Sequence, residues 1–84
     1  MSFVIDLPEP KHRALIACQI EVGLAPTGLE RMWANRTYEV IRTSDGQWRV
    51  DFGEGALEPR RDWAAVLAWF WSLRPRDVEL LEVP

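Results

Sequence analysis

The N-terminal half of the chain alternates between apolar and polar positions. From residue 14 to residue 24 every even-numbered position is apolar, whereas the odd-numbered positions include glutamine, glutamate and glycine. This period of two predicts a strand with one buried face. Ile16, Ile20 and Leu24 would also share one side of a helix, so a helix over the same residues is the alternative interpretation.

Two alternating runs in the segment Thr37–Phe52 flank the tripeptide Ser44-Asp45-Gly46. A two-residue turn between them would place Arg42 opposite Arg49, which is an unfavourable pair of like charges. We therefore predict a three-residue loop with Gly46 in the left-handed conformation. The predicted cross-strand pairs are Tyr38 with Phe52, Glu39 with Asp51, Val40 with Val50, and Arg42 with Trp48. The last pair predicts a cation–π contact at the end of the hairpin.

Between these two regions the sequence has the features of a short helix. Thr27 and Glu30 have the spacing of a capping box, in which each side chain satisfies a free backbone N–H of the first turn. Apolar side chains follow at helical spacing, at Leu29, Met32 and Trp33. We therefore predict a helix over residues 28–35, with Asn35 as its C-terminal cap.

The C-terminal third contains the most apolar segment of the chain. Ten of the eleven residues from Trp63 to Leu73 are apolar, and Pro59 and Asp62 suit the first turn of a helix. We predict a helix from about Pro59 to Leu73 that ends before Pro75. Its predicted core face consists of Trp63, Val66, Leu67, Phe70 and Leu73.

Two further short runs complete the predicted elements. Ser2–Leu7 is β-prone and is ended by proline, and Asp77–Val83 is predicted as a strand with apolar residues on both faces. The order β-β-(short α)-β-β-α-β predicts an α+β fold, a mostly antiparallel sheet of about four to five strands packed on one face by the tryptophan-rich helix. Because the chain has 84 residues, we expect residues 1–84 to form one domain.

The composition argues against catalysis and metal binding. The chain has one histidine, His12, and one cysteine, Cys18, which are too few for a Cys/His metal site. Glu39 and Asp51 would form a carboxylate pair on an exposed face, where nothing raises the pKa of one of them as acid–base catalysis requires. We therefore expect no catalytic residue, no metal, no cofactor and no enzymatic activity.

Tryptophan and arginine point to protein binding. Five tryptophans are more than so small a core readily encloses, because each ring is large and each N–H needs a partner. Exposed tryptophan beside arginine is typical of interface hot spots. The predicted partner-binding residues are Trp33, Arg42, Trp48, Arg49, Arg60, Arg61 and Trp71.

The sequence therefore predicts a small non-catalytic protein-binding module. It would act as a regulatory subunit, an adaptor or an inhibitor that occludes a partner's surface, and a homodimer is compatible with the same features. Small phage-encoded inhibitors of host complexes, anti-CRISPR proteins among them, have a comparable size and simplicity. No motif assigns the chain to such a family.

The alternative function is a small nucleic-acid-binding regulator. If residues 14–24 and 28–35 were both helical, they would resemble a helix-turn-helix, and Arg31 and Arg36 would face a groove. The formal net charge of −3 makes nucleic acid an unfavourable partner, because the affinity for phosphates comes from an excess of cationic side chains.

The remaining composition concerns the compartment. No apolar run reaches the roughly 20 residues that a membrane-spanning helix requires, and the first residues lack the basic and apolar segments of a signal peptide. A single cysteine excludes an internal disulfide. We expect a cytoplasmic protein that does not contact a membrane.

Overall fold

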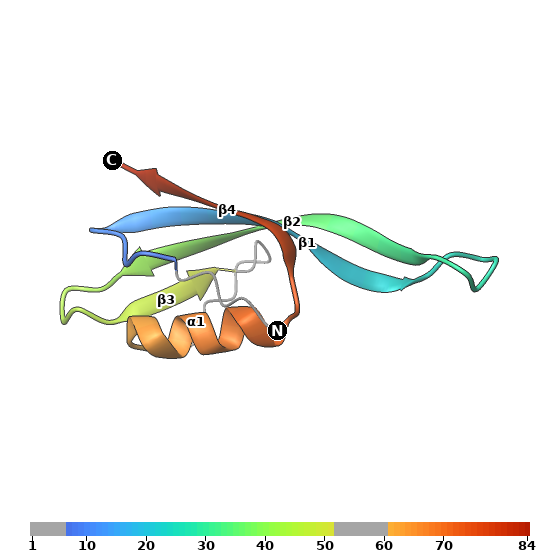
Figure 1. Ribbon diagram of the computed structural model, residues 1–84. Coiled ribbons are helices and arrows are strands. Elements are labelled where there is room, and N and C mark those ends of the chain that lie inside the picture. The colour runs from blue at the N-terminus through green and yellow to red at the C-terminus, as the bar shows by residue number, and fades with distance from the viewer. Residues whose placement is uncertain (1–6, 52–60) are drawn as a thin grey trace.

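The strands form a four-stranded antiparallel sheet in the order β3-β2-β1-β4. The computed structural model describes residues 7–51 and 61–84. The elements are β1 (Arg13–Leu24), β2 (Arg31–Arg42), β3 (Trp48–Asp51), α1 (Trp63–Ser72) and β4 (Arg76–Val83). The predicted α+β fold is confirmed (Figure 1). The strand predicted at Ser2–Leu7 lies outside the described residues, except for Leu7.

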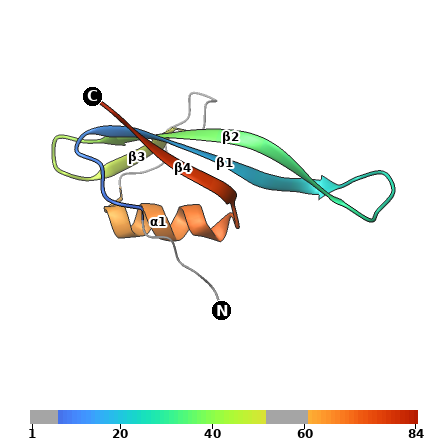
Figure 2. The same ribbon diagram turned by 45° about the horizontal axis from the view of Figure 1, so that its top comes forward.

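The molecule has two layers, because α1 lies along one face of the sheet (Figures 1 and 2). The side chains buried in the core are Leu7, Ala14, Ile16, Cys18, Tyr38, Val40, Trp48, Val50, Val66 and Phe70. Three of them are even-numbered residues of β1, so the prediction of a strand with one buried face is confirmed over its first half. The helical alternative for residues 14–24 is wrong.

β2 occupies most of the predicted helix over residues 28–35, and that prediction is wrong. Residues 25–30 form the turn that joins β1 to β2, closed by the Ala25 N–H donating to the Glu30 carbonyl oxygen at 2.7 Å. From Arg31 onward the segment pairs with β1 along its whole length. A helix of two turns is marginal in water, whereas the strand gains a continuous ladder of hydrogen bonds. The helix-turn-helix interpretation required helices at residues 14–24 and 28–35, and neither helix is present.

The β2–β3 hairpin has the predicted register. The observed pairs are Glu39 with Asp51, Val40 with Val50, and Arg42 with Trp48. Gly46 has a φ of 83°, and its N–H donates to the Thr43 carbonyl oxygen at 3.0 Å, so the loop is the predicted one. The pair between Tyr38 and Phe52 cannot be compared, since Phe52 lies outside the described residues.

Asp62 determines where α1 begins. Its carboxylate accepts a hydrogen bond from the Ala65 N–H at 2.8 Å, which satisfies one of the free donors of the first turn. Val66 and Phe70 of the predicted core face are fully buried. The other predicted members pack partly buried against the core, namely Trp63, Leu67 and Leu73. The predicted start near Pro59 is wrong, because Arg61 forms a β-bridge with Trp48 and the helix begins only after the extended Asp62. Pro59 itself lies outside the described residues.

β1 and β2 continue beyond the other elements as a two-stranded projection (Figures 1 and 2). β3 pairs with residues 39–42 of β2, and β4 pairs with residues 13–19 of β1. Within the described chain, residues 20–34 therefore have strand partners only among themselves. We call residues 20–34 the arm and the other described residues the body. The molecule is accordingly elongated, with principal extents of 48 × 33 × 22 Å.

Candidate functional site

The arm carries most of the exposed large apolar side chains. Four of the five in the described residues lie on it, at exposed fractions of 48% for Val22, 60% for Leu24, 88% for Leu29 and 44% for Met32. We call these four side chains the arm tip. No charged residue occurs from position 22 to position 29. Large exposed apolar surfaces are uncommon in monomeric proteins and are typical of binding surfaces.

The strand register directs the arm tip to both sides of the ribbon. Leu24 pairs with Arg31, whereas Met32 pairs with Gly23, because the register shifts between Glu21 and Gly23. Neighbouring residues of a strand point to opposite faces, so Leu24 and Met32 lie on opposite faces. A flat partner surface would cover only one of them. The arrangement therefore suits insertion into a cleft.

A chain of polar contacts joins three strands where the arm leaves the body. The Arg76 guanidinium carbon lies 3.9 Å from the centroid of the Trp33 ring. Arg76 Nε donates to Gln19 Oε1 at 2.9 Å, and Gln19 Nε2 donates to Asn35 Oδ1 at 3.1 Å. The guanidinium is thus held by one hydrogen bond and one ring. We call Arg31, Trp33, Arg36 and Arg76 the arm base.

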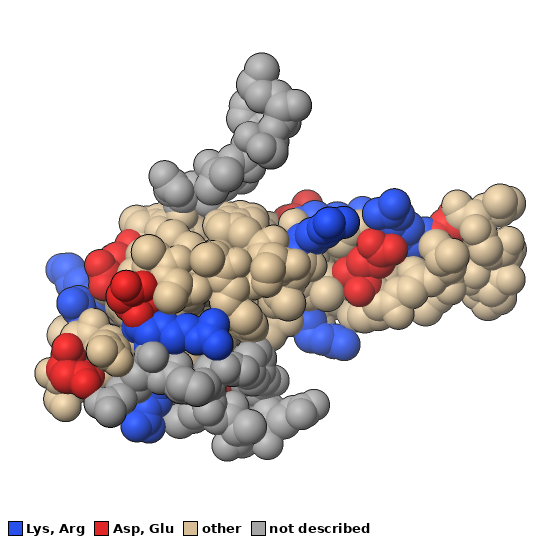
Figure 3. Space-filling view, turned by 90° about the horizontal axis from the view of Figure 1, so that it is seen from below, with Lys and Arg blue, Asp and Glu red and all other residues tan. Residues whose placement is uncertain are grey.

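The arm base is richer in cations than in anions. Arg31 contacts the Glu21 carboxylate at 3.3 Å, and both side chains are exposed, so this pair contributes little to stability. Arg36 donates to the Asn35 carbonyl oxygen at 3.1 Å, and no carboxylate of the described residues pairs with Arg36 or Arg76. Figure 3 shows lysine and arginine side chains where the arm leaves the body, and an arm end that is mostly uncharged.

Of the predicted site residues, Trp33 alone belongs to this region. Trp48 is fully buried, so its predicted exposure is wrong. The hairpin register turns its ring into the core, where it lies 5.1 Å from the Trp63 ring and its Nε1 donates to Glu9 Oε1 at 3.0 Å. Arg42 lies 5.9 Å from the centroid of Trp48, which confirms the predicted cation–π contact.

The other predicted residues are distributed over the body. Trp71 is half-buried against Phe70, at 5.1 Å between ring centroids. Arg49 is exposed on β3, and Arg61 is half-buried beside Trp48, with which its backbone exchanges two hydrogen bonds. Arg60 lies outside the described residues. The structure therefore does not gather the seven predicted residues into one surface.

Sequence reasoning missed the arm tip and Arg76 as site residues. The signal was present in the uncharged segment from Val22 to Leu29, which includes two glycines and a proline. Such a composition is typical of the turn of a hairpin. Because residues 28–35 were predicted as a helix, the segment was not recognised as the turn between two paired strands. The exposure of the arm tip was therefore not predicted.

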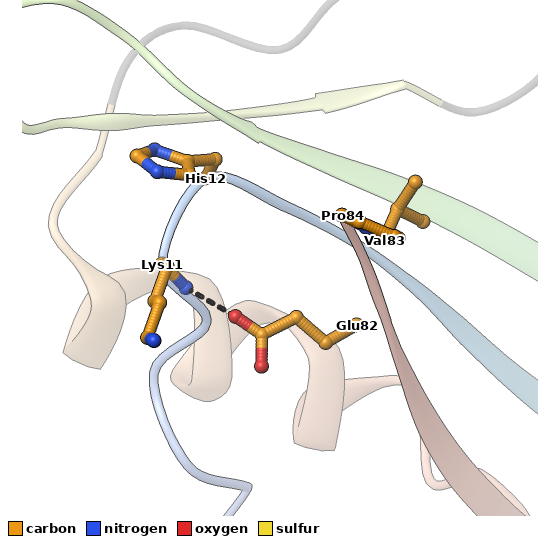
Figure 4. Close-up of a pocket in the computed structure, with 5 residues that line it drawn as sticks. All are labelled: Lys11, His12, Glu82, Val83 and Pro84. Atoms are coloured by element: carbon orange, nitrogen blue, oxygen red, sulfur yellow. Dashed lines mark hydrogen bonds between the residues drawn. The ribbon is translucent and has the colours of Figure 1, made fainter.

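The described residues contain no group of three histidine, cysteine or acidic side chains that could hold a metal ion. A cavity of about 320 Å³ is lined by Lys11, His12, Glu82, Val83 and Pro84 (Figure 4). The Lys11 backbone N–H donates to Glu82 Oε1 at 2.8 Å, and the His12 ring points away from that carboxylate. The lining has no serine, threonine or cysteine.

Cys18 is unsuited to nucleophilic chemistry. Burial raises the pKa of its thiol, and the nearby Arg36 guanidinium lowers it by a smaller amount. The side chain is therefore a neutral, buried thiol at pH 7, whereas a reactive cysteine is accessible and has a lowered pKa.

Comparison with known proteins does not add to these observations. No protein-family model, no curated protein and no solved structure matches the chain. In the described part of the chain, no helix is long and apolar enough to cross a membrane.

Proposed function

We propose that this chain is a non-catalytic binding protein that inserts its arm into a cleft of another protein. The observation that carries the proposal is the arm tip, whose apolar side chains are exposed on both faces of a projection. Complete burial of a large aliphatic side chain contributes about 1.5–3 kcal/mol. Three of the four side chains of the arm tip are already about half buried, so each of these contributes part of this amount when a partner covers it.

The body supports this function by holding the arm in place. Both arm strands continue into the sheet, where Ile16 and Val40 are fully buried under α1. The direction of the arm is therefore set before binding, which reduces the entropy lost in the complex. An inserted arm can connect a partner to the body as an adaptor or regulatory subunit does. It can also block the cleft, as an inhibitor does.

The experiment is affinity capture from a lysate of the source cells with three forms of the chain. These are the wild type, the double variant Leu24→Ser with Leu29→Ser, and the control Leu81→Ser. Leu81 is a matched control because it is 46% exposed but lies on the body. Thermal unfolding of all three forms shows that each is folded.

We expect one protein to be captured by the wild type and by the Leu81→Ser control, and to be lost with the double variant. Removing two apolar side chains from a buried tip should reduce the affinity by at least about 100-fold. Equal capture by the double variant, or no specific protein captured by any form, would contradict the proposal.

A further inference from the structure

Arg76 joins β4 to the arm and also has donor nitrogens left for an anion. Its Nε donates to Gln19, and its guanidinium carbon lies over the Trp33 ring, 3.9 Å from the ring centroid. Among the described residues, nothing pairs with its two terminal nitrogens. These nitrogens form the planar fork that matches a carboxylate or a phosphate in two parallel hydrogen bonds. Because the fork is already oriented, binding costs little side-chain entropy.

Further cations surround Arg76. Residues 19–36 and 74–77 contain four arginines and three acidic residues, although the whole chain has a formal charge of −3. Arg31 and Arg36 are exposed, and Arg31 has the Glu21 carboxylate as its partner. Among the described residues, the guanidinium groups of Arg36 and Arg76 have no carboxylate partner, so they are available to an external anion.

The arm tip decides which kind of anion fits. Duplex nucleic acid presents phosphates along the whole length of a bound ribbon, and here they would face an uncharged, apolar end. A protein can combine an apolar cleft with acidic side chains at its mouth. Met32 directly precedes Trp33 in β2, so the tip and the arm base would contact the cleft and its rim together.

We infer that the partner's cleft has aspartate or glutamate side chains at its rim, and that Arg76 binds one of them while the arm tip fills the cleft. This inference rests on the proposed function and names the chemistry of the partner. The tip supplies most of the affinity, and the arm base determines how the cleft is approached and in which orientation the arm enters. Charged groups at a rim act mainly on orientation and association rate.

The first test is a zero-length crosslink between the purified captured protein and the variant Arg76→Lys. Carbodiimide couples an amine only to a carboxyl group that touches it. Lys11 is the only lysine of the chain, but carboxyl groups of the chain can also couple to lysines of the partner in every form, so the product that tests the inference is a crosslink at position 76. Arg13→Lys is the control, because Arg13 is an exposed arginine of the body outside the predicted partner-binding residues. We expect a crosslink from position 76 of the Arg76→Lys variant to an aspartate or glutamate of the partner, mapped by mass spectrometry, and no crosslink from position 13 of the control.

The second test measures affinity for the same captured protein at low and high salt. We expect Arg76→Gln to weaken binding about tenfold at low salt and to flatten its salt dependence. Arg13→Gln, which removes the same charge from the body, should stay within about twofold of the wild type. The double tip variant should weaken binding at both salt concentrations.

These results separate the two proposals. Normal binding and no crosslink for the Arg76 variants, with binding lost in the tip variant, would overturn the acidic rim and leave the proposed function intact. Binding by the tip variant would overturn both. Capture that depends on duplex DNA, flotation with phosphatidylcholine–phosphatidylglycerol vesicles, or sedimentation as a tip-dependent dimer would each assign the arm to a different occupant and overturn the inference.

Discussion

The body and the arm contain parts of the same two strands, β1 and β2. Apolar and polar residues alternate in both regions, but the apolar side chains are buried in the body and exposed on the arm. In the body, Ala14 and Ile16 of β1 are fully buried beneath α1, and Cys18 is nearly so. Farther along the same strand, Val22 and Leu24 are about half exposed. Apolar residues continue at even positions after the covering layer has ended, but the register shift between Glu21 and Gly23 turns Leu24 to the face opposite to Met32. Apolar side chains without a second layer are available to a partner, and this distinguishes the arm from the body.

The largest expected difference between the two regions is in stability. Trp48→Ala removes a fully buried side chain of the body, and we expect it to lower the free energy of unfolding by about 3–5 kcal/mol. Leu24→Ala removes an arm side chain that is 60% exposed, and it should change the same quantity by less than about 0.5 kcal/mol. Urea denaturation followed by tryptophan fluorescence measures the Leu24 variant, and circular dichroism measures the Trp48 variant. A loss of similar size in both would show that the arm packs against the body.

A matched pair of glycines provides a smaller and sharper comparison. Gly46 in the body hairpin and Gly28 in the arm turn have φ values of 83° and 72°. An added Cβ would lie 3.8 Å from Arg42 Nη2 at Gly46, and would have no neighbour within 4 Å at Gly28. Both substitutions to alanine therefore introduce the same kind of strain, which comes from the backbone conformation alone.

We expect Gly46→Ala to lower the free energy of unfolding by about 1 kcal/mol. The effect of Gly28→Ala should be less than half as large, because the arm turn can open locally without unfolding the body. Chemical denaturation measures both variants, and hydrogen exchange of the arm amides measures the local opening. Equal losses would mean that the arm and body unfold as one unit.

The smallest expected difference concerns alkaline pH. Burial raises the pKa of Cys18 above 9.0 and that of Tyr38 above 10.0, and residues 20–34 contain neither residue type. The folded body binds these protons more tightly than the unfolded chain does. Stability from this source is therefore complete below the unfolded pKa and is lost as the pH rises through the folded pKa.

We expect Cys18→Ala to reduce the loss of stability between about pH 8 and pH 9.5, where the thiol begins to ionise in the unfolded chain. Tyr38 contributes at higher pH. The comparison uses the slope of the unfolding free energy against pH, since the cavity left by the substitution changes the absolute value. Leu24→Ala should have the wild-type slope. Identical slopes for Cys18→Ala and the wild type would contradict the conclusion that ionisation of the Cys18 thiol causes this loss of stability.

Local patterns predicted those parts of the fold that depend on near neighbours. The loop at Gly46 and the register that pairs Val40 with Val50 followed from cross-strand charge and apolar pairing. The presence of α1 followed from its apolar stripe, although the predicted start near Pro59 was several residues too early. In each case the deciding contacts lie within about ten residues, where sequence spacing corresponds directly to distance.

The candidate site depended on contacts that are distant in sequence. Arg76 meets Gln19 across 57 positions, and no pattern near either residue predicts this contact. The segment after Thr27 has the residue spacing of a helix, but a short helix is only marginally stable. The hydrogen bonds between β2 and β1 stabilise the strand more than the helical spacing stabilises a helix. Trp48 was predicted as exposed because burial depends on α1 and on the chain around Glu9, which lie far from it in sequence.

The sequence alone predicted the α+β class, the β2–β3 hairpin, the segment of the chain that forms α1, and the alternation that makes β1 a strand. Only the tertiary structure decided where the covering layer ends, and therefore which apolar side chains are buried and which form the arm tip. The physical reason is that alternation specifies the two faces of a strand, whereas burial requires a second element against one of them. The position of α1 over the body, and not over the arm, is a property of the whole chain.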